Sequence, residues 1–157
     1  MPSSSRYSSK QLQEQEAFGR FAKSLGTLAP WHKVESRPEP EPDLVCEDES
    51  GCRVAFELVS LVDEGLAKVI AAGSKARQDA FSTSDPSATI IRNKLNKKYI
   101  TNAKSIELLI YTDGRIVTPD DAIIATILPW FDAVAQNPFK RVWFMGERVT
   151  VCLWNSA

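Results

Sequence analysis

The sequence predicts a three-layer α/β domain, in which helices cover both faces of a mixed β-sheet. Two antiparallel strands joined by a tight turn are predicted for residues 42–60, and a strand buried on both faces for 106–112. Helical periodicity flanks these strands, at residues 10–25 and 85–103. A chain of 157 residues with 43% hydrophobic content is long enough for one such domain and short for two.

The N-terminal part of the chain is predicted to be a tail followed by a helix. Residues 1–9 include five serines and lack apolar periodicity, so we expect a disordered tail before a single domain that spans 10–157. Residues 10–25 follow a helical pattern that ends at Gly26 and has an apolar stripe. Its apolar members are Phe18, Phe21 and Leu25. Glu14 lies on this stripe, where a carboxylate either reaches solvent at the edge or is directed toward a positive charge.

The acidic hairpin is the best-defined element of the prediction. A short strand over 31–34 and an extended, proline-rich segment over 37–42 lead into it. Residues 43–48 and 52–60 each alternate with a period of two. The loop 49–51 between them suits a three-residue turn whose last residue, a glycine, takes the left-handed conformation.

That loop fixes a register in which Glu47 faces Arg53 and Asp43 faces Glu57. Two carboxylates at roughly 5 Å repel by a few tenths to about 1 kcal/mol, unless a cation or a shared proton lies between them. A divalent metal ion would remove the repulsion, because hard cations take oxygen ligands. Two alternatives stay open: the polar face of the hairpin meets solvent, or a slip of one residue separates the two acids.

After the hairpin, two helices are expected. Residues 63–80 can form a helix that two glycines weaken, and 82–84 form a loop. Asp85 then suits an N-cap, with Pro86 at the first position of a helix that continues to about residue 103.

The second of these helices places lysines relative to its apolar stripe. With Ile91 as reference, Lys98 falls about 20° away, within the stripe, and Lys94 about 60° away, at its margin. Lys97 points about 120° away and is expected in solvent. A lysine within a buried stripe needs an anionic partner, for which Asp43 and Glu57 are candidates. In the alternative, Lys98 packs its stem and extends its ammonium group to the helix edge.

The C-terminal third is predicted to contain a strand, a helix and a second hairpin. The strand over 106–112 is followed by a helix that starts at 118–121 and ends before Asn137. We interpret Asp120 and Asp121 as helix caps. The hairpin pairs residues 141–145 with 148–154 around Gly146 and Glu147, in a type II′ turn.

Charge and cysteine content limit the class of protein. Seven acids lie within residues 35–50, and eight bases lie within 66–104, a distribution that suits phosphate binding or a solvated helix surface. Three cysteines give no disulfide framework, and one histidine, His32, gives no zinc cluster. The sequence lacks a stretch of 18 apolar residues, so we expect a cytoplasmic protein without membrane contact.

Pro42-Asp43, a hairpin, and Glu57 in a hydrophobic strand resemble the PD-(D/E)XK nuclease superfamily. The elements around them resemble that family's αβββαβ core, which implies a restriction-endonuclease-like fold. The resemblance implies a Mg²⁺ (or Mn²⁺) site formed by Asp43, Glu57 and the Leu58 carbonyl. The chain departs from the family at Val59, which stands where the family has its lysine.

For the remaining catalytic residues, the resemblance implies a lysine supplied by another element and a glutamate from the first helix. Lys98 or Lys94 would be that lysine, and Glu14 that glutamate. The leading hypothesis is therefore a Mg²⁺-dependent endonuclease-like hydrolase that acts on nucleic acid, with DNA as the first expectation. A catalytically inactive nuclease-like binding or assembly subunit is the second hypothesis. The third is a small interaction protein that uses tryptophans as surface anchors. These tryptophans are Trp31, Trp143 and Trp154.

Overall fold

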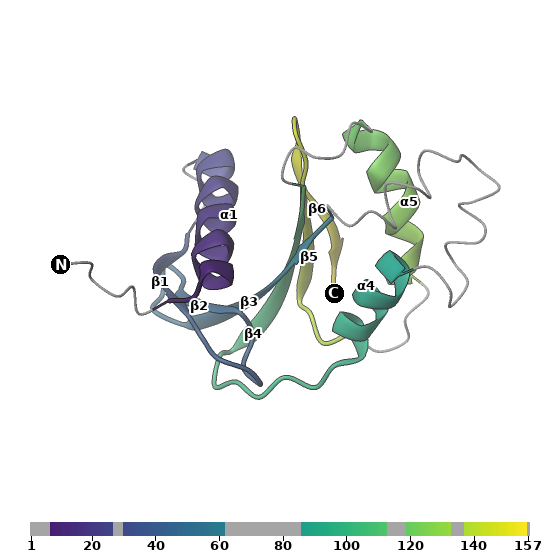
Figure 1. Ribbon diagram of the computed structural model, residues 1–157. Coiled ribbons are helices and arrows are strands. Elements are labelled where there is room, and N and C mark those ends of the chain that lie inside the picture. The colour runs from purple at the N-terminus through teal and green to yellow at the C-terminus, as the bar shows by residue number, and fades with distance from the viewer. Residues whose placement is uncertain (1–6, 27–29, 62–85, 113–118, 133–136, 157) are drawn as a thin grey trace. The chain divides into compact units, whose positions relative to one another are not determined.

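The computed structural model describes residues 7–26, 30–61, 86–112, 119–132 and 137–156 (Figure 1). In this part of the chain, three helices and a six-stranded mixed open sheet form an α/β fold, with strands in the order β1-β2-β3-β4-β5-β6. The chain forms two compact units: Met1–Leu58 with Tyr99–Ile106, and Val59–Lys98 with Glu107–Ala157.

Helix α1 (Ser9–Leu25) has a defined beginning and end. Ser8 is the N-cap: its hydroxyl accepts from the Gln11 amide, while the Gln11 side chain accepts from the Ser8 amide. Gly26, with φ of 59°, ends the helix as predicted. Of the expected tail, residues 1–6 lie outside the described part, whereas Ser8 and Ser9 belong to the helix start.

An aromatic cluster joins α1 to the strands of its unit. The Phe18 ring packs edge-on against Phe56, with 4.8 Å between centroids, and Phe21 stacks on Trp31 at 5.3 Å. Trp31 in turn packs edge-on against Phe56 at 5.1 Å. Trp31, which the interaction-protein hypothesis uses as a surface anchor, therefore contacts the core of its own unit.

The acidic hairpin has the predicted register. β2 (Leu44–Glu47) and β3 (Arg53–Ser60) are antiparallel, and Leu44 pairs with Phe56 as Glu47 pairs with Arg53. β1 (His32–Ser36) pairs with β2 on its other side, so the expected strand at 31–34 is real and extends further. A slip of one residue, the alternative that separates the two acids, is excluded.

The hairpin loop is closed by an aspartate as well as a glycine. Gly51 has φ of 81°, as predicted. Asp48 Oδ1 accepts from the Ser50 amide, the Ser50 hydroxyl and the Cys52 amide, at 2.9, 2.9 and 3.0 Å. The Asp48 carboxylate therefore stabilises the turn by hydrogen bonds to a residue of the loop and to the residue just before β3.

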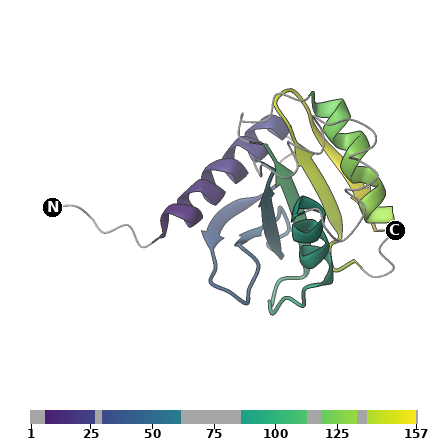
Figure 2. The ribbon, with the colours of Figure 1, turned by 45° about the vertical axis from the view of Figure 1, so that its right-hand side comes forward.

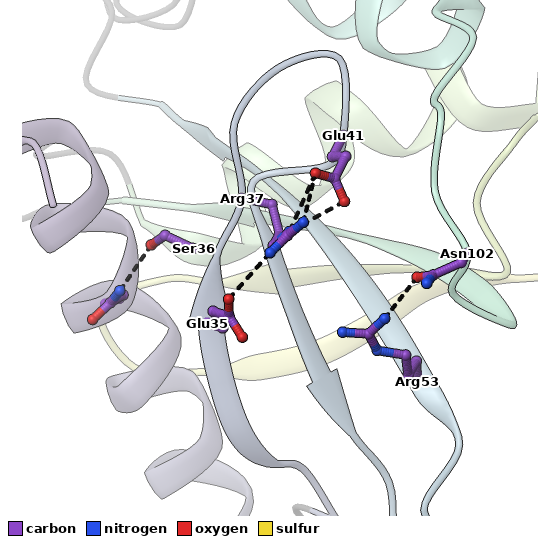
Figure 3. Close-up of polar contacts among 7 residues, drawn as sticks. Glu35, Ser36, Arg37, Glu41, Arg53 and Asn102 are labelled. Atoms are coloured by element: carbon purple, nitrogen blue, oxygen red, sulfur yellow. Dashed lines mark hydrogen bonds and ion pairs between the residues drawn. The ribbon is translucent and has the colours of Figure 1, made fainter. Parts of the chain in front are cut away.

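The segment between β1 and β2 is a turn, and the prediction of an extended segment over 37–42 is wrong. The Arg37 amide donates to the Asp43 carbonyl (2.9 Å), and the Glu41 amide to the Pro38 carbonyl (3.0 Å). The Arg37 guanidinium contacts the Glu41 carboxylate through two nitrogens and reaches Glu35 as well (Figure 3). The turn places the Arg37 guanidinium within hydrogen-bond distance of both the Glu35 and the Glu41 carboxylates, and these charge-assisted hydrogen bonds favour it.

Helix α4 spans Pro86–Asn96, so the predicted extension to residue 103 is wrong. Its start at Pro86 agrees with the prediction, and the expected helix at 63–80, loop at 82–84 and N-cap Asp85 lie outside the described residues. Beyond Asn96 the chain is irregular until β4 (Ser105–Tyr111) begins. In this segment, the Ile100 amide donates to Pro40 in the turn before the acidic hairpin, and the Lys104 amide donates to Arg53 in the hairpin, in place of helical hydrogen bonds.

The second unit contains a strand, helix and strand connection. β4 and β5 (Arg141–Met145) are parallel, and α5 (Asp120–Asp132) lies between them in the chain. β6 (Thr150–Asn155) pairs antiparallel with β5, and α5 runs beside this hairpin (Figure 2). Leu108, Leu109 and Ile110 are fully buried, as expected for a strand covered on both faces.

The turn between β5 and β6 differs from the predicted type II′ turn centred on Gly146 and Glu147. The Gly146 amide donates to the Val149 carbonyl (2.8 Å), which places Glu147 and Arg148 at the tip. Gly146 is not among the glycines with positive φ, as a type II′ turn would require. Sequence preference alone placed the turn one residue too early.

Asp120, expected to be a helix cap, binds this turn. Its carboxylate accepts from the amides of Glu147, Arg148 and Val149 at 2.9, 2.7 and 3.0 Å. Asp120 therefore connects the start of α5 to the β5–β6 turn, a role that its position in the sequence does not reveal.

Candidate functional site

Asp43 and Glu57 lie side by side at the start of the acidic hairpin. The Asp43 amide donates to Glu57 Oε1 at 3.0 Å, and the Leu58 amide donates to Asp43 Oδ2 at 2.9 Å. The Glu57 carboxylate in β3 thus accepts from the main chain just before β2, and the Asp43 carboxylate accepts from the main chain of β3. These reciprocal bonds, which we call the carboxylate clamp, hold both acids in fixed orientations.

The face of the hairpin that carries Glu57 is buried. Glu57 is 1% exposed, and its neighbours on that face, Val45, Ala55 and Val59, are buried as well. The alternative in which this face meets solvent is therefore wrong. A buried carboxylate is costly unless hydrogen bonds or a cation compensate for lost hydration, so its partners determine its chemistry.

Tyr99 is a further member of this site that the sequence did not reveal. Its hydroxyl donates to Glu57 Oε2 at 3.2 Å. Burial raises the pKa of the Tyr99 hydroxyl, and the negative charges of Glu57 and Asp43 raise it further. The helix expected to continue to about residue 103 would include Tyr99, whereas α4 ends at Asn96 and Tyr99 lies in the irregular segment that follows.

Glu14 is buried in α1, as its place on the apolar stripe predicted. It is 6% exposed, and its carboxylate lies 3.8 Å from the Lys10 ammonium, one helical turn earlier. Within the described ranges, no group of three or more His, Cys, Asp or Glu side chains is placed to hold a metal ion. The candidate metal site therefore consists of the two carboxylates Asp43 and Glu57.

The chemistry of these donors fits a hard divalent cation. Mg²⁺ in proteins is bound by one or two carboxylates, with water and substrate phosphate as its other ligands. Asp43 and Glu57 supply two carboxylates from neighbouring strands, and the Leu58 main chain adjoins Asp43. A two-carboxylate site with oxygen donors suits Mg²⁺ or Mn²⁺ better than zinc, which favours nitrogen and sulfur ligands.

The candidate lysines do not lie where the helical projection placed them. Val59, which stands two residues after Glu57, is 6% exposed and belongs to the core. Lys98 follows the end of α4 and is exposed, whereas Lys97 is half-buried, so the projection reversed the two. Lys94 lies in the last turn of α4 and is half-buried, adjacent to the buried Leu95. Of the two candidate lysines, only Lys94 therefore belongs to α4.

A second buried carboxylate, Glu107 on β4, has a structural role. It is 0% exposed and accepts from the Trp143 indole (2.7 Å) and from the Arg141 guanidinium (3.1 Å). The parallel register pairs Glu107 with Arg141, which brings the opposite charges together. The Trp143 nitrogen is thereby used within the fold, so Trp143 is a less suitable surface anchor than its sequence position indicated.

No protein-family model, curated protein or solved structure matches the chain. Among the described residues, none of the helices is long and apolar enough to cross a membrane. The function of the protein is therefore inferred from its own site residues.

Proposed function

We propose that the protein is a metal-dependent nuclease of PD-(D/E)XK type, with a three-layer restriction-endonuclease-like fold. The carboxylate clamp between Asp43 and Glu57 is the observation that supports this proposal most strongly. It brings together, from two neighbouring strands, the acids that the resemblance assigns to metal binding. The helix before the hairpin and the mixed sheet support the proposed fold in the same way.

The clamp keeps two negative charges close together in a largely buried place. The main-chain amides of Asp43 and Leu58 and the Tyr99 hydroxyl compensate part of the cost of burying them. Two carboxylates held close together also suit a divalent cation, because hard cations take oxygen ligands. Affinity for a cation is therefore the property that this arrangement favours.

In the proposed reaction, Asp43 and Glu57 would hold the metal ion, with the Leu58 carbonyl as a third ligand. A divalent ion held there would supply polarisation of the phosphate and a lowered pKa for a water molecule. The resemblance assigns the role of the family's lysine, orienting the attacking water or stabilising the developing charge, to Lys94 or Lys98. Glu14 completes the site only if its carboxylate is released from Lys10.

Exposed bases on the acidic hairpin and the segment that follows α4 provide attraction for a phosphate backbone. Arg53, Lys98 and Lys104 are exposed, and the Arg53 guanidinium donates to the side-chain oxygen of Asn102 at 3.0 Å (Figure 3). Nucleic acid, with DNA as the first candidate, is therefore the proposed substrate. Binding should weaken steeply with salt, with a log-log slope of about −0.9 for each contacted phosphate of a duplex.

Cleavage assays test this proposal and show whether Lys94 or Lys98 contributes to the reaction. Plasmid and labelled oligonucleotides are incubated with Mn²⁺ and the parent, Asp43→Asn, Lys94→Met or Lys98→Met. We expect Asp43→Asn and Lys94→Met to lose roughly 10² or more in rate, the scale of losing one transition-state electrostatic partner. Lys98→Met should reduce only phosphate attraction.

Glu49→Gln, at an exposed position in the same hairpin, is the matched control for loss of a carboxylate. It should cleave like the parent. Equal rates for the parent and Lys94→Met, with a loss in Lys98→Met, would transfer the role to Lys98. A parent that cleaves nothing with Mn²⁺ would contradict the proposed reaction.

A second candidate function is a nuclease-like binding or assembly subunit without activity. The observation that favours it is Val59, a buried apolar side chain at the position where the family has its lysine. Such a subunit would bind nucleic acid, and a divalent metal, without cleaving. Binding of a labelled duplex at low salt, together with an inactive parent, would select this candidate over the nuclease.

A further inference from the structure

Tyr99 is brought to the carboxylate clamp by a segment that is hydrogen-bonded to the acidic hairpin and to the turn before it. The Ile100 amide donates to the Pro40 carbonyl (3.4 Å), and the Lys104 amide to the Arg53 carbonyl (2.8 Å). The Arg53 side chain also binds Asn102, as Figure 3 shows. These bonds place the segment after α4 along the hairpin, so the position of Tyr99 is determined by the fold.

Hydrogen-bond donors reach both carboxylate oxygens of Glu57, and the Tyr99 hydroxyl is one of them. Glu57 Oε1 accepts from the Asp43 amide, and Oε2 accepts from the Tyr99 hydroxyl. Because each oxygen has a donor, rotation of the carboxylate about its last side-chain bond would break a hydrogen bond. Tyr99 and the main chain therefore determine together which way Glu57 directs its oxygens.

We propose that Tyr99 is a positioning residue that orients the Glu57 carboxylate for binding of a divalent metal ion. This inference rests on the proposed function, because it assigns Tyr99 to the same metal site. Hydrogen-bond partners of metal-ligating carboxylates fix ligand orientation, and their removal typically costs 10–100-fold in metal affinity. Tyr99 touches a ligand rather than the substrate, so it acts through Glu57.

The first test is a titration with Mn²⁺, in which electron paramagnetic resonance measures the free ion. Three proteins are compared: the parent, Tyr99→Phe and Tyr7→Phe. Tyr99→Phe removes only the hydroxyl, and we expect it to bind Mn²⁺ roughly 10–100-fold more weakly than the parent. Tyr7→Phe removes a hydroxyl just before the N-cap of α1 and should bind like the parent.

Metal-free melting curves separate positioning from structural support. A purely structural Tyr99 would lower the melting temperature without metal and leave Mn²⁺ affinity unchanged in the folded protein. That result would overturn the inference. A positioning residue changes the affinity even at temperatures where both proteins are fully folded.

A second measurement avoids any change at position 99. The chain has three tyrosines, so incorporation of 3-fluorotyrosine gives three ¹⁹F resonances, which Tyr7→Phe and Tyr111→Phe assign by difference. Addition of Mg²⁺ should shift the Tyr99 resonance and leave those of Tyr7 and Tyr111 in place. A Tyr99 resonance that does not respond, in a protein that Mg²⁺ stabilises, would contradict the inference.

The outcomes distinguish this inference from the proposal on which it depends. A parent that binds no Mn²⁺ would contradict the metal site itself, and with it the role of Tyr99. A parent that binds Mn²⁺ with the same affinity as Tyr99→Phe would contradict the role of Tyr99 alone.

Discussion

The carboxylate of Asp120 occupies the space that a side chain on Gly146 would need. A β-carbon built on Gly146 would overlap the Asp120 carboxylate, with Oδ1 its nearest atom. The three amides that follow Gly146 donate to the same carboxylate. A glycine is therefore required here for close approach of a side chain, and not for an unusual backbone angle.

Gly146→Ala should destabilise the protein. The added methyl group must displace Asp120 or the turn, and overpacking of this kind typically costs about 1–3 kcal/mol. Gly19→Ala is the control, since a β-carbon at Gly19 in α1 meets no atom within 4 Å. In a helix interior it should stabilise by about 0.5–1 kcal/mol. Urea unfolding measures both, and equal free energies of unfolding for Gly146→Ala and the parent would contradict the packing described.

Asp120→Ala should cost more than Asp121→Ala, although both acids lie in the first turn of α5. Loss of the Asp120 carboxylate leaves three turn amides without their acceptor, and hydrogen bonds to charged groups contribute about 1.5–3 kcal/mol each. Asp121 is exposed, so its removal loses mainly a helix-dipole interaction of about 0.3–1 kcal/mol. Chemical unfolding of the two variants gives the comparison, and equal losses would show that Asp120 acts only as a helix cap.

Asp48 should make stability depend on pH in the acid range. The hydrogen bond from the Ser50 hydroxyl, followed by that from the Cys52 amide, lowers the pKa of Asp48 in the folded protein. A lowered pKa contributes stability that is present above the unfolded value of about 3.9 and is lost as pH falls through the folded value. Below about pH 4, the parent should therefore lose stability more steeply than Asp48→Asn.

Urea unfolding between pH 5 and pH 2.5 measures this difference. The amide side chain of the Asp48→Asn variant still accepts hydrogen bonds in the turn but cannot be titrated, so this substitution isolates the charge. Glu49→Gln removes a carboxylate from the neighbouring, exposed position and should keep the parent's acid dependence. Parallel pH profiles for the parent and Asp48→Asn would contradict the role given to the turn hydrogen bonds.

Short-range sequence patterns correctly predicted the hairpin register and two helix ends. Gly51 and the alternation on either side of it fixed the hairpin register, and with it the proximity of Asp43 to Glu57. The start of α4 at Pro86 follows from the fixed φ of proline, and the end of α1 at Gly26 from the freedom of glycine to adopt a positive φ. These preferences depend only on neighbouring residues, so a single sequence is enough to predict them.

Contacts between distant segments were not predictable in the same way. Helical periodicity continues past Asn96, yet the chain leaves the helix there, and residues 99–104 form hydrogen bonds with the acidic hairpin and the turn before it instead. This change brought Tyr99 to Glu57 and left Lys98 exposed. Glu107 offered one usable signal: a lone acid within an apolar strand requires a buried cationic or hydrogen-bonding partner.

The most direct test of the metal site is the change in melting temperature on addition of Mn²⁺, measured for the parent, Asp43→Asn and Glu49→Gln. A ligand that binds only the folded state stabilises it by about 2.7 kcal/mol at a hundredfold excess over the dissociation constant. We predict that Mn²⁺ raises the melting temperature of the parent and of Glu49→Gln, and that Asp43→Asn loses this increase. The same increase in the parent and in Asp43→Asn, or no increase in the parent, would contradict a metal site formed by Asp43 and Glu57.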